Sequence, residues 1–336
     1  MRHLTRRLLT ATCLMWAAVS MAKAQSAPAD IPVVNEPVFE EEEVDDPVVL
    51  DPIAPNVKFS ETFWQPNAQA HAVDARVSYD RWVNDVKNAA GSNVGTENVK
   101  DTMGSLTYLY GLSERSAASV GLDFVSSSRD VSLTGASAYT LNSSGLSIVR
   151  FDVLHTIPLG LLSLHFGLGA DLSPGKRKEP TAASEGNAYP GGHTIRGDLG
   201  FDIRVNRGWF GVLAGFESRL RRDLETTNGA EVNITGGNQV VLLAFYEHHW
   251  GKFFLLPSIR ITPTAPESTS SPTGVSDSGA YVPTIYSLGA GYYVMNESRL
   301  TLTYERLFNP GHTTGANSAA DSYSANRVLA GVRVVF

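Results

Sequence analysis

The residues in this chain that could do chemistry are its histidines, carboxylates and arginines. A histidine near an aspartate can work as an acid–base pair, and His165 with Asp171 is one candidate. No serine stands in a recognisable nucleophile motif with a histidine. His248 and His249 are adjacent, so on a strand they would point to opposite faces and could not bind one metal ion together. We therefore expect no enzyme activity, no metal and no other cofactor.

Short alternating stretches of the chain would position the charged residues on β-strands. Ile195 and Leu199 would lie on one face of such a strand, and Arg196 and Asp198 on the other. Stretches of this kind recur at about the length that a tilted membrane strand requires. We predict twelve strands, at residues 73–83, 102–112, 117–128, 145–156, 161–172, 194–206, 208–221, 239–250, 252–263, 281–294, 298–309 and 324–336.

The connections between these stretches are short and long in turn. The short ones contain turn-forming residues, and the long ones are rich in Gly, Ser, Thr, Asn and Pro. Outer-membrane barrels keep short turns in the periplasm and long loops outside, and their strand number is even. The sequence therefore predicts an all-β fold, a transmembrane antiparallel up-and-down barrel. Its long loops would be residues 84–101, 129–144, 173–193, 222–238, 264–280 and 310–323.

The first 24 residues have the pattern of a secretory signal peptide. Basic residues precede an apolar run from Leu8 to Val19, and small residues follow it. We predict cleavage near Ala24 and integration of the mature chain into the outer membrane. Cys13 lies inside this segment, so the mature chain would contain no cysteine and no disulfide.

Residues 25–58 differ in composition from the rest of the chain. They contain nine acidic residues, one lysine and six prolines, with too little apolar content to fold alone. We predict a disordered periplasmic linker, which would be either a solvated spacer or a tether for a basic partner. Residues 59–336 would then form the barrel.

The last predicted strand alternates up to an aromatic residue, Phe336. Such a strand needs a partner, and in a closed barrel that partner is the first strand. The ending, with Gly331, Val334 and Phe336, resembles the C-terminal assembly signal of bacterial outer-membrane β-barrel proteins. This resemblance covers residues 73–336 and the signal peptide as a class of fold, and it implies insertion by the barrel-assembly machinery.

The inward faces of the predicted strands would line the lumen with arginines and carboxylates in nearly equal number. Balanced charge predicts weak ion selectivity. Twelve strands lie between the eight that side chains can fill and the sixteen that leave a clear channel. We therefore predict a narrow pore or transporter for small polar solutes. The predicted lumen and solute pathway consists of Arg76, Asp123, Arg150, Asp152, His165, Asp171, Arg196, Asp198, Asp202, Arg204, Glu217, Arg219, Arg221, Arg299, Glu305 and Arg333.

Two other functions stay open at this level. Arginine–carboxylate pairs could fill the lumen and make the chain a structural or surface-binding barrel. An outer-membrane enzyme is the second alternative. Expected partners are outer-membrane lipid and lipopolysaccharide, which the basic run at residues 176–178 could meet. Nucleic acid is not an expected partner, because the chain is acidic and has no basic stripe interleaved with aromatic residues.

Overall fold

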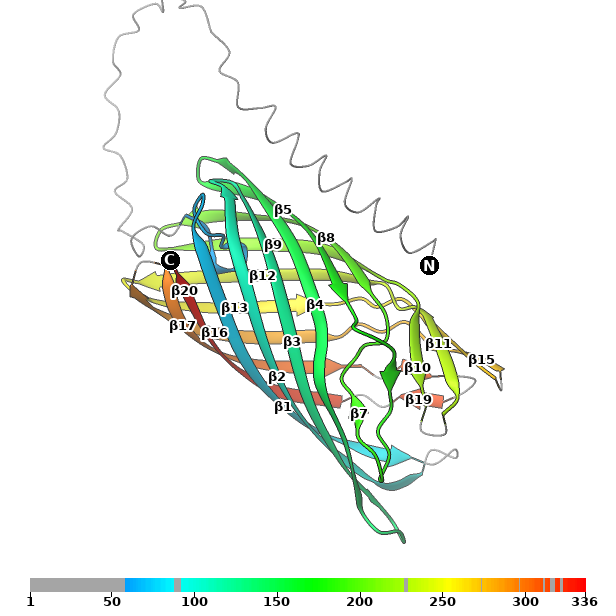
Figure 1. The fold of residues 1–336 in the computed structure, drawn as a ribbon. Coiled ribbons are helices and arrows are strands. Elements are labelled where there is room, and N and C mark those ends of the chain that lie inside the picture. Colours follow the sequence, from blue (N-terminus) through cyan, green and yellow to red (C-terminus); the bar gives the residue numbers. More distant parts are fainter. Residues whose placement is uncertain are drawn as a thin grey trace, which may run out of the picture. The chain divides into compact units, whose positions relative to one another are not determined.

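Twelve antiparallel strands form one sheet that closes on itself, which confirms the predicted barrel (Figure 1). The computed structural model describes residues 58–87, 92–226, 229–272, 274–295, 297–310, 312–314, 318–320 and 323–336, so the predicted signal peptide and residues 25–57 of the predicted linker lie outside it. The wall strands are β1 (His71–Lys87), β2 (Asn93–Ser113), β3 (Ser116–Leu133), β4 (Tyr139–Leu159), β5 (Leu162–Leu172), β8 (Thr194–Val205), β9 (Gly208–Arg219), β12 (Gln239–Trp250), β13 (Phe253–Ile261), β16 (Thr284–Met295), β17 (Ser298–Asn309) and β20 (Tyr323–Val335).

The barrel closes between its first and last strands. β1 pairs with β20 over ten residue pairs, from Ala72↔Val335 to Arg81↔Asn326. Beyond them, His71 and Phe336 exchange two backbone hydrogen bonds of 3.0 and 2.9 Å. Closure gives every wall strand two neighbours, which removes the unpaired backbone groups that hydrocarbon cannot hydrate.

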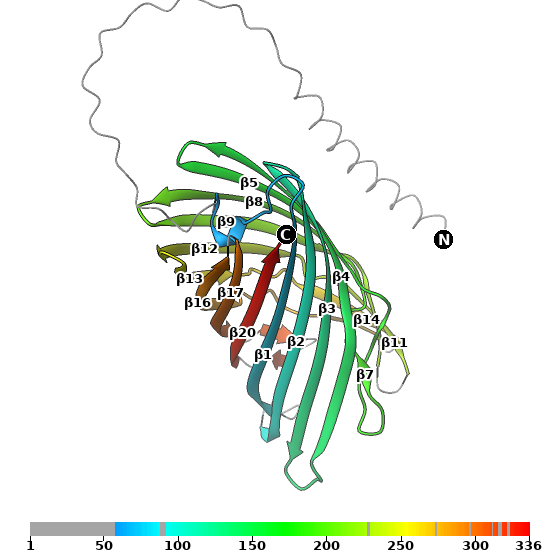
Figure 2. The ribbon, with the colours of Figure 1, turned by 60° about the vertical axis from the view of Figure 1, so that its left-hand side comes forward.

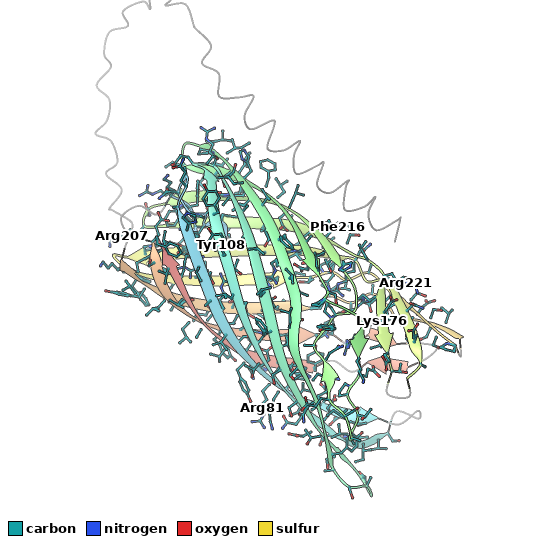
Figure 3. The ribbon with its side chains drawn as sticks, viewed as in Figure 1. Arg81, Tyr108, Lys176, Arg207, Phe216 and Arg221 are labelled. Carbon is teal, nitrogen blue, oxygen red and sulfur yellow. The ribbon has the colours of Figure 1, made fainter. Side chains whose placement is uncertain are left out.

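Apolar side chains cover the outside of this wall. Leu168, Leu199 and Phe216 keep 69%, 54% and 51% of their surface exposed, and each alternates with residues that face inward. Tyr108 and Phe216, two members of this outer belt, are labelled in Figure 3. A continuous apolar band around a closed barrel is the surface that acyl chains cover in the outer membrane.

The first four strands are longer than predicted. β2 begins at Asn93, β3 ends at Leu133 and β4 begins at Tyr139, so most of the predicted loops 84–101 and 129–144 belongs to the wall. The loop predictions were wrong there because they required an apolar face. Outside the bilayer a strand needs only its backbone hydrogen bonds to the neighbouring strands, so polar residues can continue it.

Three predicted long loops contribute to a second, five-stranded sheet, at what we call the long-loop end of the barrel. Its order is β15 (Gly274–Asp277), β14 (Glu267–Ser271), β11 (Glu231–Gly236), β10 (Arg222–Glu225) and β6 (Arg177–Lys178). Two further pairings join β7 (Gly186–Asn187) to β4, and β18 (His312–Thr314) to β19 (Ser318–Ala320). These polar segments were predicted only as loops, since none of them carries an alternating apolar face.

Arg221 belongs to this region and not to the lumen. β9 ends at Arg219, and the Arg221 guanidinium donates a 2.9 Å hydrogen bond to the Asn233 side chain on β11. The inward position expected for Arg221 is therefore corrected, because strand alternation has no meaning beyond the end of the strand. Figure 3 shows Arg221 and Lys176 at the end of the barrel opposite Arg207.

The chain approaches β1 from inside the barrel, at what we call the short-turn end. Residues 58–70 contain one short 3-10 helix, η1 (Glu61–Phe63), which Figure 2 shows among the wall strands near the C terminus. Gln69, at a φ of 62°, turns the chain into β1. Gly111 makes room for this turn, since a Cβ there would lie 1.8 Å from the Asn67 carbonyl oxygen. Within the described ranges, no helix is long and apolar enough to cross a bilayer.

Candidate functional site

Residues 59–66, here called the inner segment, are buried inside the barrel. Phe59, Phe63 and Trp64 expose only 3–6% of their surface, although they precede the wall strands and belong to no sheet. Three large aromatic side chains in six residues gain free energy by leaving water, and the barrel interior is the apolar surface next to them in the chain. The alternating pattern does not predict this segment, because the first alternating stretch begins at residue 73.

Glu61 is the charged centre of the inner segment. Its Oε2 atom lies 2.6 Å from Arg299 Nε on β17, as an ion pair, and accepts a 3.1 Å hydrogen bond from Arg333 Nη1 on β20. The Tyr293 hydroxyl on β16 donates to the other carboxylate oxygen. Burial alone would raise the pKa of Glu61, but Arg299 and Arg333 outweigh it and hold the pKa below its usual value. The carboxylate therefore stays charged and paired.

Backbone groups of the inner segment are also capped by the wall. Ser60 N donates to Asp202 Oδ2 on β8 at 3.0 Å, and Glu61 N donates to Glu247 Oε2 on β12 at 2.7 Å. Asp202 also lies 3.2 Å from His165 Nε2. Because these partners and those of the Glu61 side chain come from strands on both sides of the lumen, the inner segment crosses the lumen instead of following one wall.

Aromatic contacts fill the space around these hydrogen bonds. The Phe63 ring stacks on His165, with 3.9 Å between centroids and 8° between planes. Arg333 lies 3.8 Å above the centre of the Trp64 ring, and Trp64 Nε1 donates to Glu297 at 2.9 Å. Gly200 makes room for Phe63, because a Cβ at Gly200 would lie 2.4 Å from that ring. The space left by this wall glycine is thus occupied by protein.

Ion pairs also line the middle of the lumen, but there they remain in contact with solvent. Arg150 on β4 pairs with Asp123 at 2.8 Å and with Asp171 at 3.3 Å, and Arg196 on β8 pairs with Asp152 at 2.5 Å. The Arg150 and Asp152 side chains are 31% and 34% exposed. Because these side chains point inward from a closed wall, their exposure reports open space inside the barrel.

The predicted pathway residues fall into three groups. Those on the wall in the middle and outer parts of the lumen are Arg76, Asp123, Arg150, Asp152, Asp171, Arg196, Asp198, Glu217 and Glu305. Those near the short turns are His165, Asp202, Arg204, Arg299 and Arg333. Arg219 lies at the long-loop end, 3.4 Å from Glu267, and Arg221 lies beyond the wall.

Several inward-facing residues of the site were missed in the sequence. The sequence pattern places Glu61 and Trp64 in the barrel domain without a role, and Glu297 in a short connection. Arg327, which pairs with Asp80, alternates inward like its neighbours but was not included in the pathway. The signal that could have found the inner segment is the aromatic content of residues 59–64, which stands directly after a stretch poor in apolar residues.

Two acid–histidine pairs lie beneath the inner segment. His165 contacts Asp202 at 3.2 Å, and His249 Nε2 contacts Glu247 Oε1 at 2.5 Å, with all four side chains at most 2% exposed. Water cannot reach these pairs while the inner segment is in place. The described residues contain no group of three or more His, Cys, Asp or Glu side chains that could hold a metal ion.

Comparisons with known proteins agree with this architecture. No protein-family model and no curated protein matches the chain. The crystal structure of the COG4313 outer membrane channel from Pseudomonas putida F1 matches at a TM-score of 0.55 and 11% identity, over 83% of this chain and 99% of that one. A Pseudomonas aeruginosa FadL homologue matches at 0.42 and 9%, over 82% and 95%. At such identities the likeness to the COG4313 channel shows the barrel fold alone.

Proposed function

We propose that this protein is an outer-membrane channel for small polar solutes and that its own inner segment closes it at rest. The observation that carries the proposal is the contrast along the lumen. In the middle, inward-facing charged side chains are up to 53% exposed, and at the short-turn end the same kinds of side chain are 2–8% exposed beneath residues 59–66. A lumen that contains solvent and is closed at one end by a segment held only by non-covalent contacts is the arrangement expected of a gated channel.

Polar lining supports the expected class of solute. Arginines and carboxylates face the open part of the lumen in pairs, so their charges nearly cancel. Balanced charge favours small polar solutes with weak ion selectivity. The likeness to the COG4313 protein, an outer membrane channel, supports the same activity.

Membrane orientation follows from the class of fold. Outer-membrane barrels place short turns in the periplasm, so the inner segment would close the periplasmic mouth. The predicted signal peptide, cut near Ala24, and the ending with Gly331, Val334 and Phe336 support delivery to the outer membrane and insertion by the barrel-assembly machinery. The predicted linker, which ends at residue 58 directly before the inner segment, would then lie in the periplasm.

Liposome swelling tests this proposal. Two proteins are compared, the mature chain and a variant whose residues 59–66 are replaced by eight Gly and Ser residues, with neutral sugars of increasing size. We expect slow swelling with the mature chain, and fast swelling with the variant for the smallest sugars only. The absence of swelling with either protein, although both are folded and inserted, would contradict a channel.

A structural or surface-binding barrel is the second candidate. The observation that favours it is the close packing of the inner segment, in which the Glu61 side chain is 2% exposed. Such packing would suit permanent closure. The same swelling experiment separates the two functions through the mature chain, because a gated channel gives slow swelling and a permanently closed barrel gives none.

A further inference from the structure

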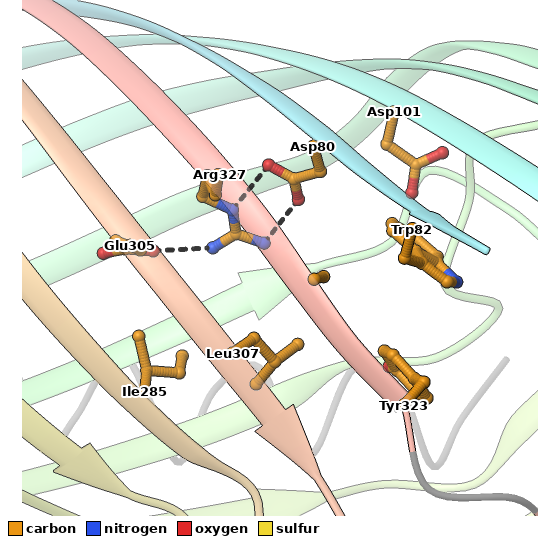
Figure 4. Close-up of a pocket in the computed structure, with 9 residues that line it drawn as sticks. Asp80, Trp82, Asp101, Ile285, Glu305, Leu307, Tyr323 and Arg327 are labelled. Carbon is orange, nitrogen blue, oxygen red and sulfur yellow. Dashed lines mark hydrogen bonds and ion pairs between the residues drawn. The ribbon is translucent and has the colours of Figure 1, made fainter. Parts of the chain in front are cut away.

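A second feature of the lumen lies apart from the inner segment, toward the long-loop end. A cavity of about 150 Å³ opens there between β1, β2, β16, β17 and β20 (Figure 4). All the side chains that line it belong to inward-facing positions in the registers of these strands. The cavity is therefore reached from inside the barrel and not from the lipid side.

Acidic side chains dominate the charge of this cavity. Arg327 on β20 donates to both oxygens of Asp80 at 2.7 Å and lies 3.3 Å from Glu305. Asp101 on β2 is the third carboxylate of the lining. Three carboxylates against one guanidinium leave a formal charge of −2, so the cavity favours a positively charged occupant.

Asp101 is satisfied only in part by the described part of the chain: the Ser127 side chain hydrogen-bonds to the carboxylate, and one of its oxygens is left without a partner. Its Oδ1 atom is shielded from solvent and has no hydrogen-bond partner among the described residues, and no ion pair reaches Asp101 within 4.0 Å there. Arg129, the cation on the neighbouring strand β3, faces Glu97 at 3.9 Å instead. A partly buried carboxylate without a close cationic partner costs free energy, which a positively charged occupant of the cavity would offset.

Aromatic and apolar side chains complete the cavity. The rings of Trp82 and Tyr323 lie 5.8 Å apart with 20° between their planes, and Figure 4 shows Trp82 below Asp101 and Tyr323 further from the two aspartates. Ile285 and Leu307 form an apolar part of the lining. Aromatic faces attract ammonium groups through their quadrupole, and alkylated ammonium ions also need apolar contact. Carboxylate, aromatic ring and aliphatic surface together match one class of solute.

We propose that this cavity is a lumenal binding subsite for a small organic cation of the alkylammonium class. The ammonium group lies between Asp101 and the Trp82 ring, and the alkyl groups contact Ile285 and Leu307. The inference deepens the proposed function, since it names the class of solute that the channel holds on its way through. A cavity of about 150 Å³ is large enough for a group the size of a benzene ring, and choline is a suitable probe.

Isothermal titration calorimetry on the detergent-solubilised mature chain tests this subsite. Choline is compared with 3,3-dimethylbutan-1-ol, which has the same shape and no charge. We expect choline to bind at least tenfold more tightly than the alcohol. Equal affinities would overturn the proposal in favour of an apolar cavity, and no binding of choline would overturn it outright.

Variants then locate the subsite. Asp101→Asn keeps the shape of the side chain and removes its charge, and we expect it to weaken choline binding at least tenfold. Trp82→Leu, from the other side of the cavity, should weaken it severalfold. Asp85→Asn is the matched control, because Asp85 lies on the exposed outer face of β1 and loses the same charge. Unchanged choline affinity in both Asp101→Asn and Trp82→Leu would overturn the assignment.

Conductance of the same preparations separates this inference from the channel proposal. A protein that conducts ions but binds no choline has a channel without this subsite. A protein that binds choline through Asp101 but conducts under no condition retains the subsite, and the channel proposal fails alone.

Discussion

Arginine–carboxylate pairs occur in two parts of the lumen, with opposite surroundings. Asp74 lies at the boundary between them: it pairs with Arg76, whose side chain is 53% exposed, and with Arg333, whose side chain is 5% exposed. The difference between these two arginines comes from the inner segment, which covers Arg333 with Trp64 and leaves Arg76 in open space. The same chemistry thus anchors a closed end and lines an open middle.

Reversing the charge of Glu61 should have the largest effect on the difference between these two parts of the lumen. Glu61→Lys would place a third cation beside Arg299 and Arg333, and breaking a buried pair of this kind costs about 3–5 kcal/mol. We expect the inner segment to leave the lumen, which would raise the open probability of the channel in planar bilayers toward one. Glu185→Lys, at an exposed position in the predicted loop 173–193, makes the same charge change and should leave gating as it is. Equal open probabilities in both variants would contradict the anchoring role of Glu61.

Protonation of Glu61 at acid pH should also release the inner segment, with a smaller effect than the charge reversal. The folded-state pKa of Glu61 lies below its ordinary value of 4.5, so its charge contributes stability that is fully present above that pH and lost as the pH falls through the depressed pKa. Open probability should therefore stay low from neutral pH to about pH 4.5 and rise below it. Recordings from pH 7 to pH 3 check this, with Glu61→Gln as the variant that should lose the acid response. A rise in open probability already between pH 7 and pH 5 would point to another group.

Removing one aromatic anchor should have a smaller effect. Trp64→Leu loses the ring beneath Arg333 and the hydrogen bond to Glu297, while most of the apolar contact remains. We expect a loss of about 2 kcal/mol in the free energy of unfolding and brief openings in bilayers. Trp250→Leu, on the exposed outer face, is the matched control and should not open the channel. Wild-type gating in Trp64→Leu would mean that Glu61 alone holds the segment.

The smallest change is expected in the open middle of the lumen. Arg76→Gln removes a solvent-exposed partner of Asp74, and such pairs are worth about 0–1 kcal/mol. Thermal unfolding should hardly shift, and reversal potentials should show a slight gain in cation preference. Arg333→Gln, at the other side of the same carboxylate, should destabilise the protein several times more. Similar unfolding temperatures for the two variants would remove the distinction between the closed end and the open middle.

The barrel could be predicted from the sequence because lipid on one side of the wall and water on the other require apolar and polar residues to alternate. Leu199 and Arg196 alternate as the two faces of one wall require, and this alternation gave the strand number and the closing seam. Contacts between side chains inside the lumen follow no such alternation. Phe63 is buried by its stack on His165 and by the space that Gly200 leaves in the wall, and neither contact follows from the alternation of the strands. The polar upper parts of β2 and β3 were missed for a related reason, since no lipid patterns them.

The connection between the inner segment and β1 sets how far the obstruction can travel. Only residues 67–70 separate them, and four extended residues span about 14 Å. A released segment would therefore remain tethered at the mouth, at an effective local concentration in the millimolar range or above. Reclosure would be intramolecular and fast. A soluble peptide with the sequence of residues 59–66 would have to reach a comparable concentration to compete for the same site in the lumen.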